Sequence, residues 1–233
     1  HWFIELAGRM LLLPDWKSKV IYTDLRYPFQ REFFAMQGVT PERLISMDWY
    51  SLYQFKSLSV PFWPHYSPAP HSYRALQEMA GLPAVSEAEK RMPKHIYFSR
   101  GDIKGRRDVE NEREIQAVLD AYGFTGLHCS SYSLQDQIRL ARNAECIVFP
   151  HGAAGLNLVF ARPGTVCVEL MPPGKVRDNN YLNICQGIGH HYYRIVGTND
   201  EAASEQANFH IPPDLLERTL AHILGSPAKK VSQ

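Results

Sequence analysis

CIVFPHGAAGLNLVFARPGTVCVE, residues 146–169, is the stretch that decides the fold of this chain. Its first four residues form an apolar run, short enough for a buried parallel strand, which Pro150-His151-Gly152 ends. Residues 153–161 then have the pattern of a helix, and residues 165–170 have that of a second strand. A strand, a turn, a helix and a strand in this order predict one unit of a parallel α/β sheet.

The turn after the first strand of this unit is a predicted anion site. Ligands of parallel α/β sheets bind at the carboxyl ends of the strands, where His151 and Gly152 lie. Free backbone N–H groups and the helix dipole favour a phosphate there, and Gly152 lets the backbone come close to it. His151 either donates to that phosphate or acts as a base, or it is a hydrogen-bonded structural residue, the commoner role after a buried strand.

Strands and helices alternate along the rest of the chain. The predicted strands are 19–23, 43–47, 95–99, 126–129, 146–149, 166–170 and 192–196, and the predicted helices are 2–13, 28–37, 71–80, 110–122, 133–143, 153–161, 181–187 and 213–224. This alternation predicts an α/β fold with two Rossmann-like domains, residues 1–88 and 89–233, and a ligand cleft between them. Because residues 2–13 have no helix cap before them, we expect the N-terminal domain to be incomplete.

Composition excludes several classes of protein. The chain has 25 basic and 24 acidic residues and a net charge near +1, which gives no support for nucleic-acid binding. No run approaches the ~20 apolar residues of a membrane span, so none is predicted. The four cysteines have no C-x-x-C spacing and are expected to be buried free thiols, which points to the cytoplasm. The sequence also lacks a G-x-G-x-x-G fingerprint after a strand, a Walker loop, a H-E-x-x-H metal motif and a G-x-S-x-G elbow.

A basic loop, SRGDIKGRRDVENE at residues 99–112, follows the strand at 95–99 and lies on the same sheet edge as His151. It carries four cations: Arg100, Lys104, Arg106 and Arg107. Because guanidinium groups match phosphate oxygens bidentately, these cations could bind a diphosphate, and the alternative is a solvated basic turn. At the end of the loop, Asn111 and Glu112 could cap the next helix, or Glu112 could orient one of the arginines.

Two further polar residues belong to the candidate site. Asn157 lies within the predicted helix 153–161 and either fixes the loop before it or is a surface residue. Glu169 ends the strand at 166–170, where it could accept hydrogen bonds from a ribose diol. The alternative for Glu169 is a buried acid paired with an arginine.

Several segments together resemble glycosyltransferase family 61, which includes bacterial capsular-polysaccharide enzymes, plant xylan transferases and animal protein O-linked sugar transferases. They are HWFIE (1–5) with LLL (11–13), YFSR (97–100) with RR (106–107) and NE (111–112), YGF (122–124), SL (133–134) with Gln137, and PHGAAGLNLVFARPGT (150–165) with VEL (168–170). The resemblance covers most of the chain, and we expect a bacterial member. The chain departs from the family pattern at GRM (8–10) and GLN (155–157).

The resemblance implies a GT-B-like fold of two facing Rossmann-like domains and an inverting hexosyl- or pentosyltransferase that usually needs no metal. No cofactor is implied beyond the donor substrate, a nucleotide-diphosphate sugar, expected to be UDP-linked. Arg100 and Arg107, with Arg106 beside them, would bind the diphosphate; His151, Gly152 and Ala153 would approach the phosphates; and Glu169 would lie near the nucleoside. The acceptor would be a glycan in capsular or extracellular polysaccharide synthesis, at the cytoplasmic face of the inner membrane. The oligomeric state stays open.

The base that deprotonates the acceptor is the least determined role. Glu5 ranks first because the N-terminal domain should face the acceptor, although a helix-surface carboxylate is nearly as good an interpretation. His151 ranks second, and Asp24 or Asp48 follow. Two other functions stay open: a non-catalytic family member that binds nucleotide or glycan, and an unrelated sugar-nucleotide enzyme such as an epimerase.

Overall fold

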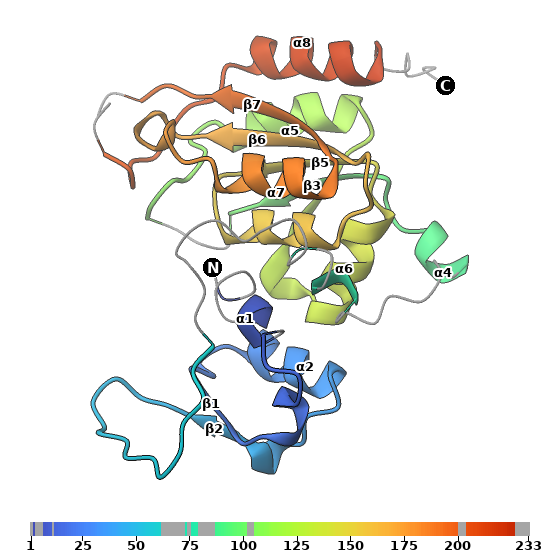
Figure 1. Cartoon of the computed structure of the whole chain (residues 1–233). Coiled ribbons are helices and arrows are strands. Elements are labelled where there is room, and N and C mark those ends of the chain that lie inside the picture. Colours follow the sequence, from blue (N-terminus) through green and yellow to red (C-terminus); the bar gives the residue numbers. More distant parts are fainter. Residues whose placement is uncertain are drawn as a thin grey trace.

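The chain is described from a computed structural model, which covers residues 2, 7–10, 12–61, 73, 76–78, 87–101, 105–199 and 204–226. Its described residues form two parallel sheets, one of two strands and one of five (Figure 1). The mixed α/β class and the parallel pairing predicted from the sequence are therefore confirmed. The facing of two complete GT-B domains stays a prediction.

The five-stranded sheet has the order β4-β3-β5-β6-β7, and all its pairs are parallel. Its strands are β3 (His95–Ser99), β4 (Thr125–His128), β5 (Cys146–Pro150), β6 (Val166–Met171) and β7 (His191–Val196). Strand β5 lies at the centre, and all five of its residues are buried. An unbroken apolar run is what a strand covered on both faces requires, so the CIVF stretch correctly predicted the middle of the sheet.

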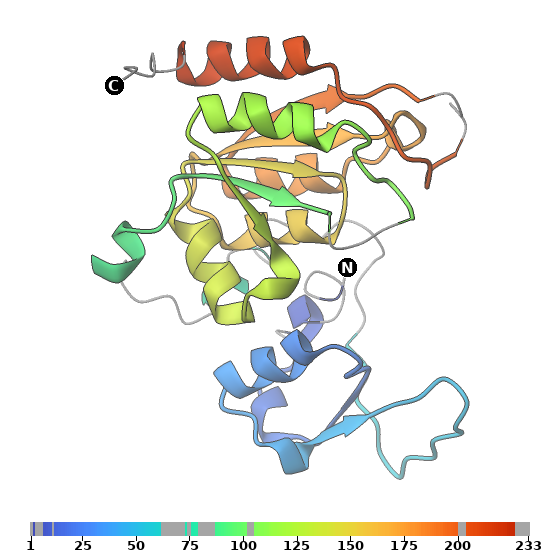
Figure 2. The ribbon, with the colours of Figure 1, turned by 180° about the vertical axis from the view of Figure 1, so that it is seen from behind.

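Helices cover both faces of this sheet (Figures 1 and 2). They are α5 (Glu112–Ala121) and α8 (Pro213–Leu224) on one face, and α6 (Leu134–Asn143), η5 (Ala153–Phe160) and α7 (Asn180–Ile188) on the other. Alternate residues of β5 serve the two faces: Cys146 and Val148 pack with α5 and α8, while Ile147 and Phe149 pack with the helices opposite. The sheet is therefore doubly wound, as the alternation along the chain predicted.

A smaller unit precedes the large sheet and lies below it in Figure 1. Strands β1 (Ile21–Thr23) and β2 (Leu44–Ser46) form its two-stranded sheet, with α2 (Pro28–Met36) between them in sequence. Its other elements are α1 (Gly8–Met10), η2 (Trp16–Ser18) and η3 (Pro41–Arg43), and α4 (Glu87–Lys90) leads into β3. Short 3₁₀ turns η4 (Cys129–Ser131) and η6 (Pro173–Lys175) complete the larger part.

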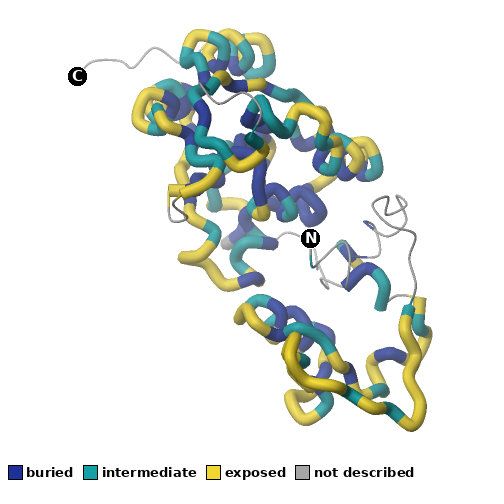
Figure 3. Tube along the Cα trace, turned by 90° about the vertical axis from the view of Figure 1, so that its left-hand side faces the viewer, coloured by how far each residue is buried: buried dark blue, intermediate teal, exposed yellow. Residues whose placement is uncertain are grey.

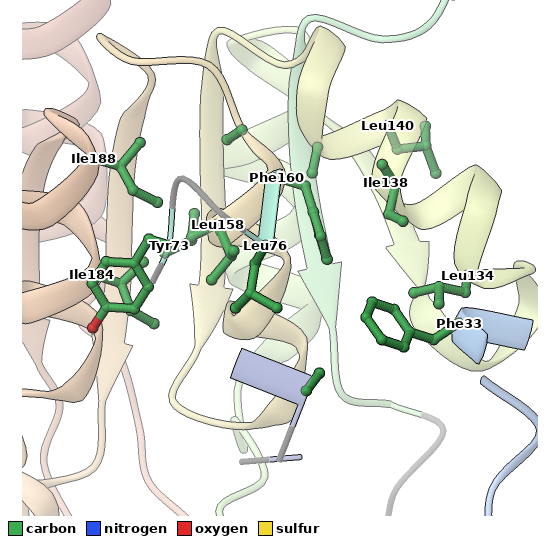
Figure 4. Close-up of a cluster of buried hydrophobic side chains, with 14 of the residues drawn as sticks. Phe33, Tyr73, Leu76, Leu134, Ile138, Leu140, Leu158, Phe160, Ile184 and Ile188 are labelled. Carbon is green, nitrogen blue, oxygen red and sulfur yellow. The ribbon is translucent and has the colours of Figure 1, made fainter. Parts of the chain in front are cut away.

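The two parts of the chain share one hydrophobic core. Phe33 and Phe34 of α2 belong to the same buried cluster as Leu134 of α6, and Figure 4 shows Phe33 beside Leu134. Tyr73 and Leu76 join this cluster next to Leu158 and Ile184. The contact is therefore a continuous apolar one and not a solvated hinge.

A carboxylate reinforces the same contact. Glu32 of α2 accepts hydrogen bonds from the backbone N–H groups of Leu134 (2.8 Å) and Gln135 (3.0 Å), at the start of α6. A negative charge at a helix N-terminus satisfies free N–H groups and complements the helix dipole. Glu32 therefore fixes the angle at which the smaller unit meets the larger one.

One predicted helix has a different geometry. Residues 153–160 form a 3₁₀ helix, with an i to i−3 bond from the Gly155 N–H to the Gly152 carbonyl (3.0 Å). The Gly152 carbonyl also accepts the hydroxyl of Tyr181. This helix is thus tied to α7 at its first turn.

Burial follows the two-part division. The strands of the large sheet are mostly buried, whereas the loop after β2 is largely exposed (Figure 3). As expected, Cys146, Cys167 and Cys185 are buried free thiols, and Cys129, also free, is partly exposed. None of the helices within the described ranges is long and apolar enough to cross a membrane.

Candidate functional site

The strand register brings Arg100 and His151 to one edge of the sheet. Tyr97 of β3 pairs with Val148 of β5, and Arg100 and His151 each follow three residues later. His151 also donates its backbone N–H to the carbonyl of Leu170 at 2.8 Å, which extends the pairing of β5 and β6. The carboxyl ends of three neighbouring strands therefore meet here, the expected ligand position in such a sheet.

Gly152 allows the closest approach at this edge. A Cβ atom on residue 152 would lie 2.0 Å from Nη1 of Arg100, so any larger residue would displace the guanidinium. The backbone of Gly152 is extended, with φ 168° and ψ −178°. It is therefore the contact with Arg100, and not the backbone conformation, that requires glycine at this position.

Arg100 and Arg107 form a pair of partly desolvated cations. Arg100 is 7% exposed and donates through Nη2 to the carbonyl of Arg106 at 3.4 Å. Burial lowers the pKa of Arg107, and the nearby charge of Arg100 lowers it further. In the part of the chain that the structure describes, Nε of Arg100 and Nε of Arg107 are both buried without a hydrogen-bond partner. Two like charges with unsatisfied donors favour an anionic ligand between them.

The backbone of Arg107 is held in an unusual conformation. Its φ is 56°, the left-handed region that non-glycine residues rarely adopt, and its N–H donates to the carbonyl of Gln206 at 3.0 Å. Asp108 continues this attachment, because its N–H donates to Asn208 Oδ1 at 3.0 Å. Arg107 and Asp108 are thus fastened to residues 206–209 by backbone and side-chain hydrogen bonds.

His151 lies between two carboxylates. Its Nδ1 is 2.6 Å from Glu169 Oε1, and its Nε2 is 3.5 Å from Asp178 Oδ2. Burial lowers the pKa of His151, but the hydrogen bonds and charges of Asp178 and Glu169 outweigh it and raise the pKa above its ordinary value. The same pairing with His151 lowers the pKa of Asp178 to about 2. The two carboxylates therefore favour the protonated form of the imidazole.

Glu169 is fully buried and fully paired. Besides His151, it accepts the hydroxyl of Tyr192 and lies 3.4 Å from Nε of Arg194. Burial and the charge of Glu169 raise the pKa of Tyr192, which therefore stays a hydrogen-bond donor. These contacts are those of a buried acid paired with an arginine. In this structure Glu169 orients His151 and offers no oxygen to solvent.

Four residues that the sequence did not single out complete the network: Asp178, Tyr181, Tyr192 and Arg194. Arg194 stands opposite Glu169 in the register of β6 and β7, and it fixes the loop before α7 by donating to the carbonyl of Asp178 at 2.6 Å. The pairing of β6 with β7 is the feature that relates Arg194 to Glu169.

The remaining predicted residues have mainly structural contacts. Asn111 is the residue before α5 but makes no side-chain cap; its side chain bonds the backbone of Ile211 at 2.8 and 3.0 Å. Glu112 accepts the hydroxyls of Ser99 (2.5 Å) and Tyr97 (3.1 Å), so it braces the end of β3.

Asn157 donates to Gln137 Oε1 at 3.2 Å and ties η5 to α6, while Ala153 is exposed beside Gly152. Arg106 is exposed as well, and it contributes its carbonyl to Arg100. Arg100, Arg107, His151 and Gly152 therefore make up what we call the candidate anion site.

Two predicted residues, Glu5 and Lys104, lie outside the described residues. Of the other acids considered as a base, Asp24 accepts the backbone N–H of Arg26 at 3.0 Å. Asp48 accepts the backbone N–H groups of Tyr50 and Ser51 at 2.8 and 2.7 Å. Within the described ranges, no group of three or more His, Cys, Asp or Glu side chains is arranged to hold a metal ion.

Comparison with known families gives one match. The family model described as Glycosyltransferase 61 matches residues 1–168, which include Arg100, Arg107, His151 and Gly152. The matched range ends one residue before Glu169. No curated protein matches the chain.

Proposed function

The chain belongs to glycosyltransferase family 61, and we propose that it transfers a sugar from a nucleotide-diphosphate sugar, UDP-linked, to a hydroxyl of a glycan acceptor, with inversion at the anomeric carbon. The observation that carries the proposal is the candidate anion site. Among the described residues, Arg100 and Arg107 present buried, unpartnered Nε donors at the ligand-binding edge of a doubly wound sheet, where His151 is paired with two carboxylates.

In this proposal the arginines bind the donor diphosphate. Each guanidinium supplies donors in a planar fork that matches two phosphate oxygens, and Gly152 leaves room for Arg100 against the turn. The bond between the anomeric carbon and the diphosphate oxygen breaks as the acceptor oxygen attacks from the opposite face. The nucleoside diphosphate leaves with added negative charge, which Arg100, Arg107 and His151 stabilise.

His151 acts as a donor rather than as the base. Both its nitrogens face carboxylates, which raise its pKa and so favour the protonated form. A protonated imidazole cannot accept the acceptor proton, but it can donate to a phosphate oxygen. The base then comes from another residue, for which we keep Glu5 as the candidate in the N-terminal part of the chain. A role in capsular or extracellular polysaccharide synthesis at the inner membrane rests on the family alone.

The first test is a thermal-shift panel of nucleoside diphosphates, followed by titration calorimetry with the best ligand. Arg107→Ala should raise the Kd for UDP by more than about tenfold, because a charge-assisted hydrogen bond to phosphate is worth about 1.5–3 kcal/mol. Arg218→Ala removes an exposed arginine of α8 and should leave the Kd unchanged. An unchanged Kd in folded Arg107→Ala would refute the diphosphate role.

A second assay tests the transfer itself. The protein is incubated with UDP-sugars, with and without glycan acceptors, and the anomeric configuration of the product is read by NMR. Inverted product with an acceptor supports the proposal, and retained configuration contradicts it. Nucleotide binding without any turnover would instead indicate a non-catalytic family member. An altered sugar nucleotide in the absence of acceptor would indicate an epimerase-like enzyme.

A further inference from the structure

Asp178 has an unusual position for an acid. It lies in the loop between η6 and α7, and its side chain is 19% exposed. Its Oδ1 accepts the backbone N–H of Asn180 at 3.0 Å, while its Oδ2 lies 3.5 Å from Nε2 of His151. A negatively charged group therefore occupies the one side of His151 that Glu169 leaves open.

The two carboxylates that contact His151, those of Glu169 and Asp178, differ in how easily a ligand can displace them. Glu169 is fully buried and is bonded to Tyr192 and Arg194 as well as to His151. Among the described residues, the carboxylate of Asp178 accepts the Asn180 N–H and has the longer contact with His151, and the charge of Lys175 also acts on it. An incoming ligand can therefore replace Asp178 at Nε2, whereas it cannot replace Glu169 at Nδ1.

The charge of Asp178 also acts on Arg107. Its charge partly offsets the lowering of the Arg107 pKa that burial and Arg100 cause. Asp178 thus acts on two members of the candidate anion site, His151 and Arg107, from a single position. A phosphate group bound to the same donors would have the same sign of charge and would compete for the same N–H group.

We propose that the Asp178 carboxylate is an internal occupant of the candidate anion site, and that a phosphate oxygen of the bound nucleotide replaces it at His151 Nε2. This inference rests on the proposed function, because it assumes that the site binds a diphosphate. Asp178 then lowers the affinity for every anion that binds at His151, since each must first displace its carboxylate. That cost is the same for each ligand, so the advantage of a diphosphate over inorganic phosphate or a nucleoside monophosphate comes from its second phosphate at the arginines.

The test is calorimetry of UDP, UMP and inorganic phosphate at fixed ionic strength. Asp178→Asn keeps an oxygen for the Asn180 N–H but removes the charge, and Asp178→Ser keeps a capping oxygen with a smaller side chain. Both variants should bind UDP at least about fivefold more tightly than the wild-type protein, and UMP and phosphate should gain by a similar factor because they displace the same carboxylate. The matched control, Asp214→Asn, removes one exposed acid of α8 and should change none of the affinities.

The possible results distinguish this inference from the proposed function. A purely structural role for Asp178 predicts weaker binding in both variants, so a weaker or unchanged UDP affinity in either folded variant overturns the inference alone. If the wild-type protein binds neither UDP nor pyrophosphate, the proposed function fails and the inference fails with it. Tighter UDP binding in both folded variants, with unchanged affinities in Asp214→Asn, supports both.

Discussion

Replacing Gly152 by alanine should weaken nucleotide binding and leave the fold intact. The new Cβ atom would lie 2.0 Å from Nη1 and 3.1 Å from Cζ of Arg100. The guanidinium must therefore retreat by about 1.5 Å to reach an ordinary van der Waals separation. Alanine adopts the extended backbone of residue 152 without strain, so only the side chain of Arg100 has to move.

Gly152→Ala should change the free energy of unfolding less than it changes the free energy of UDP binding. The atoms that move are at the end of a flexible side chain, so the free energy of unfolding should change by less than about 1 kcal/mol. A guanidinium displaced by more than an ångström loses its charge-assisted hydrogen bond to phosphate, worth about 1.5–3 kcal/mol. That loss corresponds to a Kd for UDP about 10- to 100-fold higher than in the wild-type protein.

The assay pairs UDP calorimetry with urea denaturation, and a second glycine provides the control. A Cβ atom on Gly126, in the edge strand β4, would meet only the side chain of Gln116 at 3.0 Å. Gly126→Ala should therefore change neither the Kd nor the unfolding midpoint by much. If folded Gly152→Ala binds UDP with the wild-type Kd, Arg100 is not a phosphate ligand and the reasoning about this edge is wrong.

Three further predictions address the rest of the network. Glu32→Ala removes the carboxylate at the start of α6 and should lower the free energy of unfolding by about 1–2 kcal/mol in urea denaturation, whereas Glu217→Ala on the exposed face of α8 should not. Glu169→Gln leaves the buried His151 and the partly buried Arg194 without their acid and should cost about 3–5 kcal/mol of stability, and a loss below about 1 kcal/mol would show that the pairing is not formed. The pKa of His151 is raised above its ordinary value, so the protonated form is present below that raised pKa and is lost as the pH rises through it; calorimetry over a pH series should show UDP affinity falling across that range, and His151→Asn should abolish the dependence.

The strands of the large sheet and its ligand-binding edge could be predicted from the sequence, because each follows from a rule that acts on a short stretch of chain. Apolar runs bounded by glycine and proline predicted the strands of the large sheet, and β3 and α8 have the predicted bounds. Ligands bind at the carboxyl ends of parallel strands, and this rule alone predicts that Arg100 and His151 lie at one edge of the sheet. The register of β3 and β5 confirms it. These two predictions needed only the periodicity of the strands and the direction of the chain.

The acids around His151 could not be assigned in the same way. Glu169 was expected either near the nucleoside or as a buried acid, and only the register of β6 with β7, which sets Arg194 opposite it, shows its partners. Asp178 lies in a loop with no periodic pattern, so nothing in the sequence places its carboxylate against His151. Side-chain pairing across a loop depends on tertiary packing, which a single sequence does not encode in any local signal.

The most direct test of the central claim is a crystal structure of the protein with bound UDP. We expect phosphate oxygens within hydrogen-bond distance of Arg100, Arg107 and His151 Nε2, beside Gly152, with the Asp178 carboxylate turned away from the imidazole. A diphosphate bound elsewhere on the chain, with no phosphate at Arg100 and Arg107, would contradict the account.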